Sequence, residues 1–267
     1  MNHIFVVVDS ATFESVRESE FLRERFAAFE RRTTLLASGL TYTGLYFYGE
    51  RTYFELLPAD LGFAVGTTGI AYGVDGLDAL GEVQEAWTRT FGSPPDTALQ
   101  VRAKDDGEWV AWYRMLLAPR VETPGGLWTW AMVWAPDYLQ TWWGDPDPAP
   151  AALGRREYLS KYFRPDLLLR DVIGAEFSLT EADERKLVKE LGALGFEVTE
   201  EGETRLLRSD DVFFRIRRAS SGLSSLRALV LRLNVQGGVP TTVSVGPTWE
   251  LTIDGARQTA VWRFIGE

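Results

Sequence analysis

The stretch Asn2-His3-Ile4-Phe5-Val6-Val7-Val8-Asp9 has the character of a buried strand that ends at an acid. It recurs without gaps as Thr68-Gly69-Ile70-Ala71-Tyr72-Gly73-Val74-Asp75, with isoleucine, valine and aspartate in the same three places. Each copy is followed by a segment with helical spacing of apolar residues. The sequence therefore predicts a repeated unit in which a strand leads into a helix.

Helical periodicity and the strands after it extend each unit. Leu22, Phe26 and Phe29 at i, i+4 and i+7 predict the first helix, and the stripe of the second ends at Gly92. The strands predicted next are Thr43–Gly49 and Arg51–Leu57 in the first unit, then Ala98–Ala103, Trp109–Leu117 and Trp128–Ala135 in the second. Each unit is thus expected to consist of a strand, a helix and further strands.

The second half of the chain repeats the theme. A third unit begins at Val172–Phe177, and the tail predicts strands near 241–245, 249–253 and 259–264, which favour a closing antiparallel meander. The Pro/Gly-rich segment Gly144–Pro150 interrupts the pattern and is taken as the boundary. We therefore expect two domains, residues 1–145 and 151–267.

The amino-acid composition and net charge exclude several kinds of functional site and disfavour some partners. The chain has 267 residues, a formal net charge of −10, no cysteine and a single histidine. These numbers exclude disulfides, thiolate metal sites and a cysteine nucleophile. The acidic excess disfavours nucleic-acid and anionic-membrane partners and is compatible with a neutral or cationic ligand. It is explained equally well as an aid to solubility. Because no signal peptide or membrane-length apolar run is found, a cytoplasmic protein is expected.

Strand–helix–strand–strand–strand units used in pairs resemble the vicinal oxygen chelate superfamily of glyoxalases, extradiol dioxygenases and bleomycin-resistance proteins. The resemblance is carried by the opening strand, by Glu55 in the strand Thr52–Leu57, and by the restart Gly66–Tyr72. The first hundred residues look most like an uncharacterised glyoxalase-like bacterial family without an established activity. The resemblance implies an α+β fold of repeated βαβββ units that form cupped mixed sheets, with a third unit and the C-terminal antiparallel meander.

The resemblance also implies half of a metal site. Metal-binding members take one ligand from the first strand and a glutamate from the last strand of each unit, which assigns His3 and Glu55. In the second unit Gly69 stands in the place of His3, and Trp128–Ala135 contains no carboxylate. Since catalytic sites typically use three protein ligands, we expect no cofactor. A divalent metal remains the alternative, with ligands added by the partner in a homodimer.

Without a metal, His3 and Glu55 remain candidates for catalysis. A carboxylate on a buried strand face requires a partner, which His3 or an arginine could provide, and burial raises the pKa of such a carboxyl toward the range of acid/base catalysis. In the simpler alternative, His3 caps a strand and Glu55 is solvated at a sheet edge.

Aromatic residues form the other candidate site. Alternation predicts one face holding Trp128, Trp130, Met132 and Trp134, and places Trp112 with Arg114 on a face of the neighbouring strand. Tyr46 and Tyr48 share a face of their strand, and Tyr53 shares one with Glu55. These side chains could stack on a planar or cationic ligand, with Arg114 pairing with a ligand carboxylate or with Glu55. They could equally form a core between units or an oligomer contact.

Three functions follow. The first is a small-molecule binding or sequestering protein with an incomplete metal site. The second is a glyoxalase-like lyase, isomerase or oxygenase that uses His3 and Glu55 as metal ligands or as an acid/base pair. The third is an oligomeric interaction protein.

Overall fold

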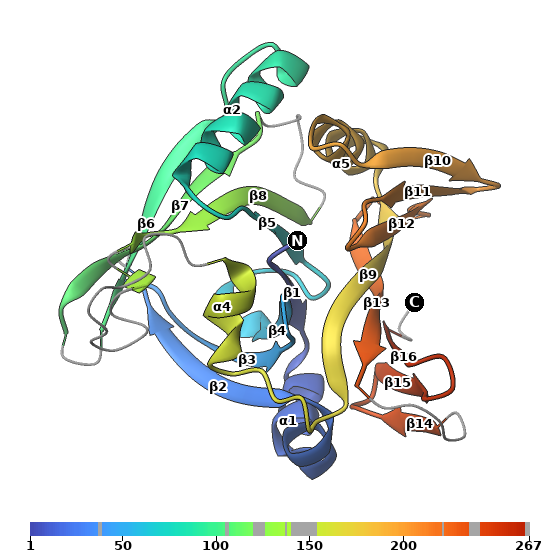
Figure 1. Cartoon of the computed structure of the whole chain (residues 1–267). Coiled ribbons are helices and arrows are strands. Elements are labelled where there is room, and N and C mark those ends of the chain that lie inside the picture. Colours follow the sequence, from blue (N-terminus) through green and yellow to red (C-terminus); the bar gives the residue numbers. More distant parts are fainter. Residues whose placement is uncertain are drawn as a thin grey trace.

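Two eight-stranded mixed sheets make up the protein, one from each half of the chain (Figure 1). The computed structural model describes residues 1–36, 39–104, 107–119, 126–136, 138–139, 154–220, 222–234 and 241–264. The predicted α+β class with repeated βαβββ units is confirmed. The predicted boundary segment, 144–150, lies outside the described residues. No described helix is long and apolar enough to cross a membrane.

The first sheet has the order β2-β3-β4-β1-β5-β8-β7-β6. Its first unit contains β1 (His3–Val8), α1 (Ser10–Glu18), β2 (Ala28–Leu35), β3 (Thr41–Tyr48) and β4 (Tyr53–Pro58). Its second unit contains β5 (Thr68–Gly73), α2 (Leu77–Phe91), β6 (Asp96–Ala103), β7 (Trp109–Leu117) and β8 (Leu127–Trp134). The two opening strands β1 and β5 pair antiparallel at the centre, and each runs parallel to the last strand of its own unit.

The second sheet repeats this strand order as β10-β11-β12-β9-β13-β16-β15-β14, but β13 and β16 pair antiparallel, whereas β5 and β8 pair parallel. Its third unit contains β9 (Leu169–Leu179), α5 (Glu181–Ala193), β10 (Glu197–Glu201), β11 (Thr204–Arg208) and β12 (Phe213–Arg218). Then follow β13 (Ser225–Leu233), β14 (Thr241–Ser244), β15 (Trp249–Asp254) and β16 (Thr259–Phe264). The predicted meander is therefore part of a fourth unit that begins with β13.

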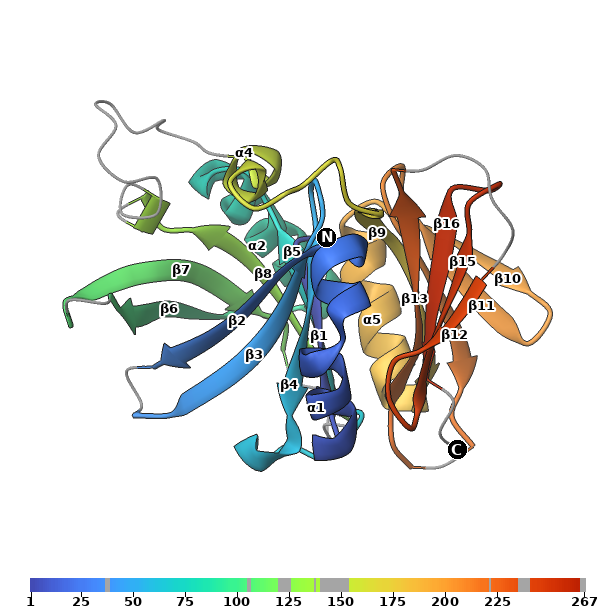
Figure 2. The same cartoon turned by 90° about the horizontal axis from the view of Figure 1, so that it is seen from below.

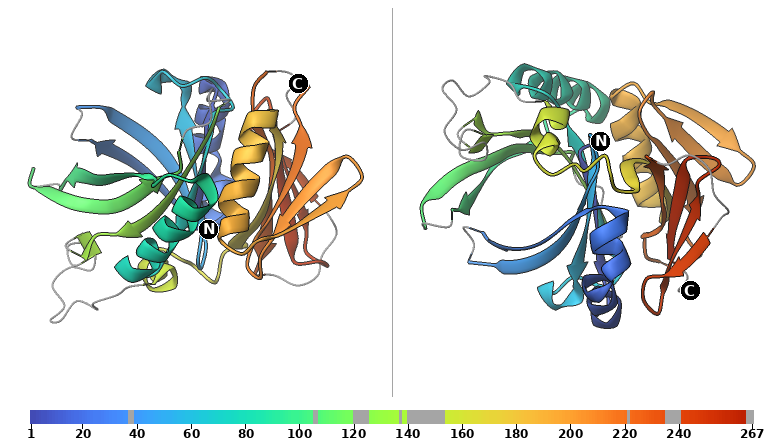
Figure 3. Two further views of the ribbon diagram at one scale, coloured as in Figure 1. Left: turned by 90° about the horizontal axis from the view of Figure 1, so that it is seen from above. Right: turned by 60° about the horizontal axis from the view of Figure 1, so that its bottom comes forward.

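The two sheets differ in curvature. The first curls until its edges approach, as the right view of Figure 3 shows, and an isolated bridge joins Leu36, just after β2, to Arg102 on β6. The short helix α4 (Arg155–Ser160) lies over one end of this curl in Figure 1 and packs Tyr158 and Leu159 against its aromatic residues. The second sheet stays open.

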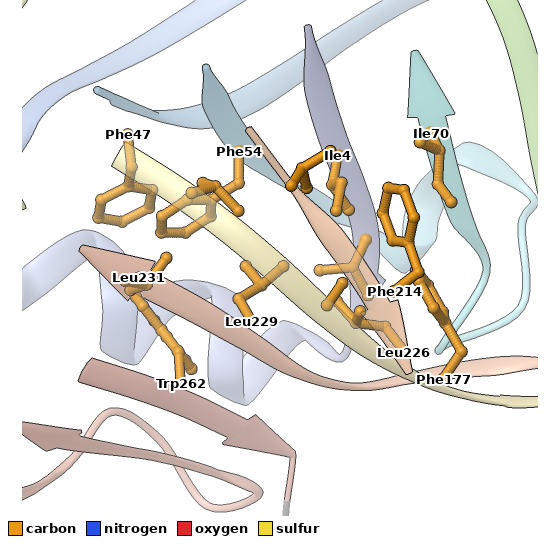
Figure 4. Packing of buried hydrophobic residues seen from close by; sticks show 14 of the residues in the cluster. Ile4, Phe47, Phe54, Ile70, Phe177, Phe214, Leu226, Leu229, Leu231 and Trp262 are labelled. Atoms are coloured by element: carbon orange, nitrogen blue, oxygen red, sulfur yellow. The ribbon is translucent and has the colours of Figure 1, made fainter. Parts of the chain in front are cut away.

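The main core lies between the two sheets, with α1 and α5 also between them (Figure 2). Strand alternation explains the composition of this core, because every second residue faces it. Ile4 and Phe54 reach it from the first sheet, and Leu229 and Trp262 from the second (Figure 4). The centres of the Phe54 and Trp262 rings are 5.2 Å apart. The intervening residues of the first sheet therefore face the interior of the curl.

A buried polar cluster links the halves. Glu190 of α5 is fully buried, and its carboxylate lies 3.0 Å from the Lys186 ammonium. Thr129 on β8 donates to the same carboxylate at 2.8 Å, and Tyr72 on β5 donates at 3.2 Å. Burial raises the pKa of Glu190, while Lys186 and these hydrogen bonds act against the rise. The second half thus contributes an acid that satisfies polar groups of the first.

The first predicted helix is wrong in its extent. Helix α1 ends at Glu18, a π-helical turn (Leu22–Phe26) follows, and Phe29 already belongs to β2. Both Leu22 and Phe26 are buried, as the helical spacing predicted, but Phe29 packs on Phe47 from a strand, with ring centres 5.2 Å apart. The apolar spacing could not separate one long helix from a turn followed by a strand.

Candidate functional site

A cavity of about 410 Å³ lies inside the curl of the first sheet. We call it the aromatic cavity. Its lining contains eight of the residues predicted for a site, namely His3, Tyr46, Tyr53, Glu55, Trp112, Trp128, Trp130 and Trp134. They come from β1, β3, β4, β7 and β8, and strand alternation turns them all toward one side of the sheet. The structure therefore brings the two predicted sites, the His3–Glu55 pair and the tryptophans, into one cavity.

Arg114 is not part of the cavity, and the prediction that it shares a face with Trp112 is wrong. The pairing of β6 with β7 shifts register between Gln100 and Val101, so that Trp112 is an extra, bulged residue of β7. After a bulge the alternation restarts on the other face. Trp112 and Tyr113 consequently both line the cavity, whereas Arg114 is exposed on the opposite face.

Tyr48 lies beside the cavity without lining it. Its ring stacks on Tyr162, which follows α4, with centres 4.4 Å apart. Its hydroxyl donates to the Glu30 carboxylate of β2. Tyr48 thus helps to fix the segment that covers one end of the curl.

His3 and Glu55 face each other at the base of the aromatic cavity. The distance from His3 Nε2 to Glu55 Oε1 is 3.5 Å, and both residues are buried. The His3 ring stacks on Tyr53 with centres 4.5 Å apart and an interplanar angle of 17°. The Trp130 ring meets it edge-on at 5.4 Å. The histidine is therefore held between two aromatic rings, which fixes its orientation toward Glu55.

One hydrogen bond defines the tautomer of His3. Its Nδ1 lies 2.8 Å from the side-chain oxygen of Asn2, which can only accept, so Nδ1 carries the proton. In the neutral ring, Nε2 then presents a lone pair to Glu55. This arrangement suits a protonated Glu55, which can donate toward Nε2.

The pKa values of the two groups move in opposite directions. Burial, followed by the positive charge of Arg32, lowers the pKa of His3 to about 3. Burial raises the pKa of Glu55 to about 7, against the effects of Arg32 and the Tyr46 hydroxyl. Near neutral pH His3 is neutral, and Glu55 exists as both acid and carboxylate. The pair can therefore exchange a proton with a bound molecule at physiological pH.

Arg32 is the main residue that the sequence reasoning missed. Its guanidinium carbon lies 4.1 Å from the centre of the Tyr46 ring, and Nη1 is 3.3 Å from a Glu30 oxygen. Its side chain is only 13% exposed and lines the cavity. The residue was overlooked because β2 was not predicted. The β-branched pair Thr33-Thr34 beside it was the available sign of a strand.

Several polar atoms in the wall of the cavity lack partners. The indole nitrogens of Trp112, Trp130 and Trp134 and the Nε of Arg32 are buried without a hydrogen bond to any described residue. An unsatisfied buried donor costs about 1–3 kcal/mol. These donors suit a bound molecule that carries acceptors.

The donor set does not fit a transition metal well. His3 Nε2 and one Glu55 oxygen are two donors, and the described residues contain no group of three histidine, cysteine or acidic side chains that could hold an ion. Catalytic sites typically combine three protein ligands with an open position. We therefore derive no chemical step through a metal.

The chain belongs to the Family of unknown function (DUF5829), whose model matches residues 1–264. This agrees with the predicted membership of an uncharacterised family. No curated protein matches the chain. A hypothetical protein from Staphylococcus aureus is similar in structure, with a TM-score of 0.56, 14% identity, and coverage of 92% of this chain and 95% of its own. At this identity the similarity supports the fold alone.

Dioxygenase structures are also found, at lower similarity. An extradiol ring-cleaving dioxygenase from B. fuscum has a TM-score of 0.43 and 11% identity, covering 100% of this chain and 72% of its own. A mutant of 4-hydroxymandelate synthase from Streptomyces coelicolor has a TM-score of 0.39 and 12% identity, covering 86% and 68%.

Proposed function

We propose that the protein binds a small, planar and largely apolar molecule in the aromatic cavity. The observation that carries the proposal is a cavity of about 410 Å³ walled by tryptophans and tyrosines. Typical small-molecule sites measure about 300–1,000 Å³ and combine apolar walls with a few polar groups. Flat aromatic rings would stack on such walls.

The charge of the walls defines the ligand further. Arg32 is the strong cation of the lining, His3 is neutral, and Glu55 is only partly ionised near neutral pH. With unmet indole donors close by, the walls favour a ligand with an acceptor group, such as a carbonyl, phenolate or carboxylate. A cationic ligand, which net charge alone allowed, fits these walls less well.

Calorimetric titration with three flat probes tests the proposal. Naphthoate, naphthol and N-methylquinolinium share a ring system and differ in charge and acceptors. We expect naphthoate or naphthol to bind at one site per chain and quench tryptophan fluorescence, and the cation to bind least. Trp130→Ala should weaken binding at least about tenfold. Trp109→Ala, at an exposed tryptophan outside the cavity, should not. Binding that Trp130→Ala leaves intact would refute the assignment.

A second candidate function rests on the His3–Glu55 pair. The Glu55 carboxylate, whose pKa is raised to about 7, can take a proton from a carbon next to a carbonyl and return it, with the neutral His3 imidazole beside it. This places the second candidate among lyases and isomerases of the glyoxalase-like type. The strand order of the first sheet supports a relationship to the vicinal oxygen chelate superfamily.

Hydrogen exchange in D₂O tests this second function without knowledge of the substrate. Arylpyruvates and aryl hydroxymethyl ketones are incubated with the protein, and loss of the signal of the C–H next to the carbonyl is followed by NMR. We expect exchange with the unsubstituted protein and none with Glu55→Gln or His3→Asn. Equal exchange in all three proteins would remove the acid/base function.

The third alternative, an oligomer contact through the tryptophan face, has less support. Trp112, Trp130 and Trp134 are buried within a single chain. Little of their surface is left for a partner.

A further inference from the structure

The face of the second sheet that points away from the main core carries a second hollow, with a volume of about 860 Å³. It is lined by residues of β9, β12, β13 and β16, and Val65 and Gly66 of the first half close one side. We call it the arginine groove. It is separate from the aromatic cavity, which shares no lining residue with it.

The arginine groove concentrates positive charge in an acidic protein. The chain has 38 acidic residues against 28 basic ones, yet this lining contains one acid, Glu176, and five arginines: Arg215, Arg217, Arg218, Arg227 and Arg263. Like charges gathered in one hollow repel one another, and a bound anion relieves that repulsion.

The acids around the arginine groove do not neutralise it. Arg215 lies 3.5 Å from Glu176, and Arg218 lies 3.9 Å from Glu184 of α5. Neither Arg227 nor Arg263 forms an ion pair with a residue that the structure describes. These two guanidinium groups therefore keep their donors available to a ligand.

Strand register explains how the arginines converge. Arg215 pairs with Glu176, Glu176 with Ala228, and Ala228 with Arg263, so these four residues form one row across β12, β9, β13 and β16. Because the side chain of Ala228 is small, it leaves space above the sheet between Arg215 and Arg263. A bulge in β13 between Leu226 and Ala228 inserts Arg227 beside the row.

Hydroxyl groups add neutral donors to the same surface. Arg217 pairs with Ser178, and Ser178 with Ser225, in the next row of the sheet. Arg217 also donates through Nε to the Thr204 hydroxyl at 3.2 Å.

One further acid, Glu250 on β15, faces Arg263 in register, without an ion pair between them. Donors thus dominate the floor of the arginine groove.

We propose that the arginine groove binds a small molecule with at least two anionic groups, either phosphates or carboxylates. Guanidinium forks bind both groups through paired hydrogen bonds, and arginines spaced along a row can hold two anions at once. A nucleic acid is the less favoured occupant, because the chain carries a net charge of −10. This site is independent of the function proposed for the aromatic cavity.

Calorimetry at low ionic strength tests the proposal with four probes: pyrophosphate, citrate, inorganic phosphate and a short single-stranded oligonucleotide. We expect pyrophosphate or citrate to bind at one site per chain, more tightly than inorganic phosphate and with an affinity that falls with added salt. The stronger of the two identifies phosphate or carboxylate as the preferred group.

Variants with equal charge loss localise the site. The double variant Arg215→Met and Arg263→Met should weaken binding at least about tenfold. The control, Arg185→Met with Arg257→Met, removes the same charge outside the lining and should bind as the unsubstituted protein does. Thermal melts establish that both fold. Absence of binding by pyrophosphate and citrate, equal losses in both double variants, or tighter binding of the oligonucleotide would each overturn the proposal.

Discussion

The two sheets share a strand order and differ in the side chains that their strands present away from the core. β1 pairs with β4 over six residues, from His3–Tyr53 to Val8–Pro58, and β9 pairs with β12 over six, from Gly174–Phe213 to Leu179–Arg218. In both halves the next residue, Asp9 or Thr180, caps a helix through its side chain. The positions of β1 and β4 can therefore be matched one by one with those of β9 and β12.

The side chains at matched positions differ in charge and polarity. The place of Glu55 is taken by Arg215, and that of Trp128 by Arg263. The place of His3 is taken by Gly174, above which the Phe213 ring lies so close that a Cβ would meet it at 2.5 Å. One strand order thus supports an aromatic cavity in the first sheet and a cationic groove on the second. The fold leaves the function to the side chains.

The largest expected effect comes from breaking the link between the halves. Glu190→Ala leaves Lys186, Thr129 and Tyr72 without their buried acceptor, and we expect a loss of about 3–5 kcal/mol in the free energy of unfolding. Chemical denaturation followed by tryptophan fluorescence measures it. Glu181→Ala, at an exposed position of the same helix, is the control and should change stability by less than about 1 kcal/mol.

The shape of the same denaturation curve sharpens the comparison. If Glu190 holds two separable halves together, the variant should unfold in two steps, whereas the control should unfold in one. A Glu190→Ala protein as stable as the control would contradict the role given to this cluster.

The His3–Glu55 pair, which the second sheet lacks, should shape the pH dependence of stability. Stability from His3, whose pKa is lowered from 6.5 to about 3, is present above pH 6.5 and is lost as the pH falls through 3. Stability from Glu55, whose pKa is raised from 4.5 to about 7, is present below pH 4.5 and is lost as the pH rises through 7. Between pH 4.5 and 6.5 the two trends oppose each other.

Glu55→Gln separates the two trends. As the pH rises from 4.5 to 6.5, the free energy of unfolding of the variant should increase by up to about 1.4 kcal/mol per pH unit. That of the unsubstituted protein should change less over the same range. Denaturation midpoints measured across this range provide the test. Parallel profiles for the two proteins would show that Glu55 does not titrate in this range.

A substitution at Gly69 should change the free energy of unfolding by less than Glu190→Ala does. Phe5 pairs with Gly69 where Glu176 pairs with Ala228, and a Cβ at Gly69 would meet the Phe5 ring at 2.0 Å. Gly69→Ala should cost about 1–3 kcal/mol and push Phe5 into the aromatic cavity, weakening naphthoate binding. Gly81→Ala is the control, because it sits in open space on α2 and should stabilise by about 0.5–1 kcal/mol. Unchanged stability in Gly69→Ala would count against the tight packing of the cavity wall.

Metal addition should have the smallest effect. Because His3 and Glu55 supply only two donors, Zn²⁺, Ni²⁺, Mn²⁺ or Fe²⁺ should leave the melting temperature unchanged. Elemental analysis after expression with these metals checks the same point. One metal per chain, lost in His3→Ala, would contradict the incomplete site.

Periodicity and the internal repeat predicted the units, because strand alternation and unit order are local properties of the sequence. The cupped sheet and the pairing of His3 with Glu55 were expected from the family resemblance. Features that depend on tertiary context were missed. Trp112 is bulged by its pairing with β6, which moved Arg114 to the opposite face. Because the turn after α1 has the apolar spacing of a helix, β2 was not predicted, and Arg32 on β2 was therefore missed. The arginine groove was not predicted, because its arginines come from strands β12, β13 and β16, whose register with one another and with β9 only the structure defines.

The most direct test of the account is a calorimetric titration of naphthoate into protein already saturated with pyrophosphate. Two separate sites predict one naphthoate site per chain with the same affinity as in the free protein. Trp130→Ala should abolish only the naphthoate signal, and the double variant of Arg215 and Arg263 only the pyrophosphate signal. Displacement of one probe by the other, or no naphthoate binding at all, would contradict the account.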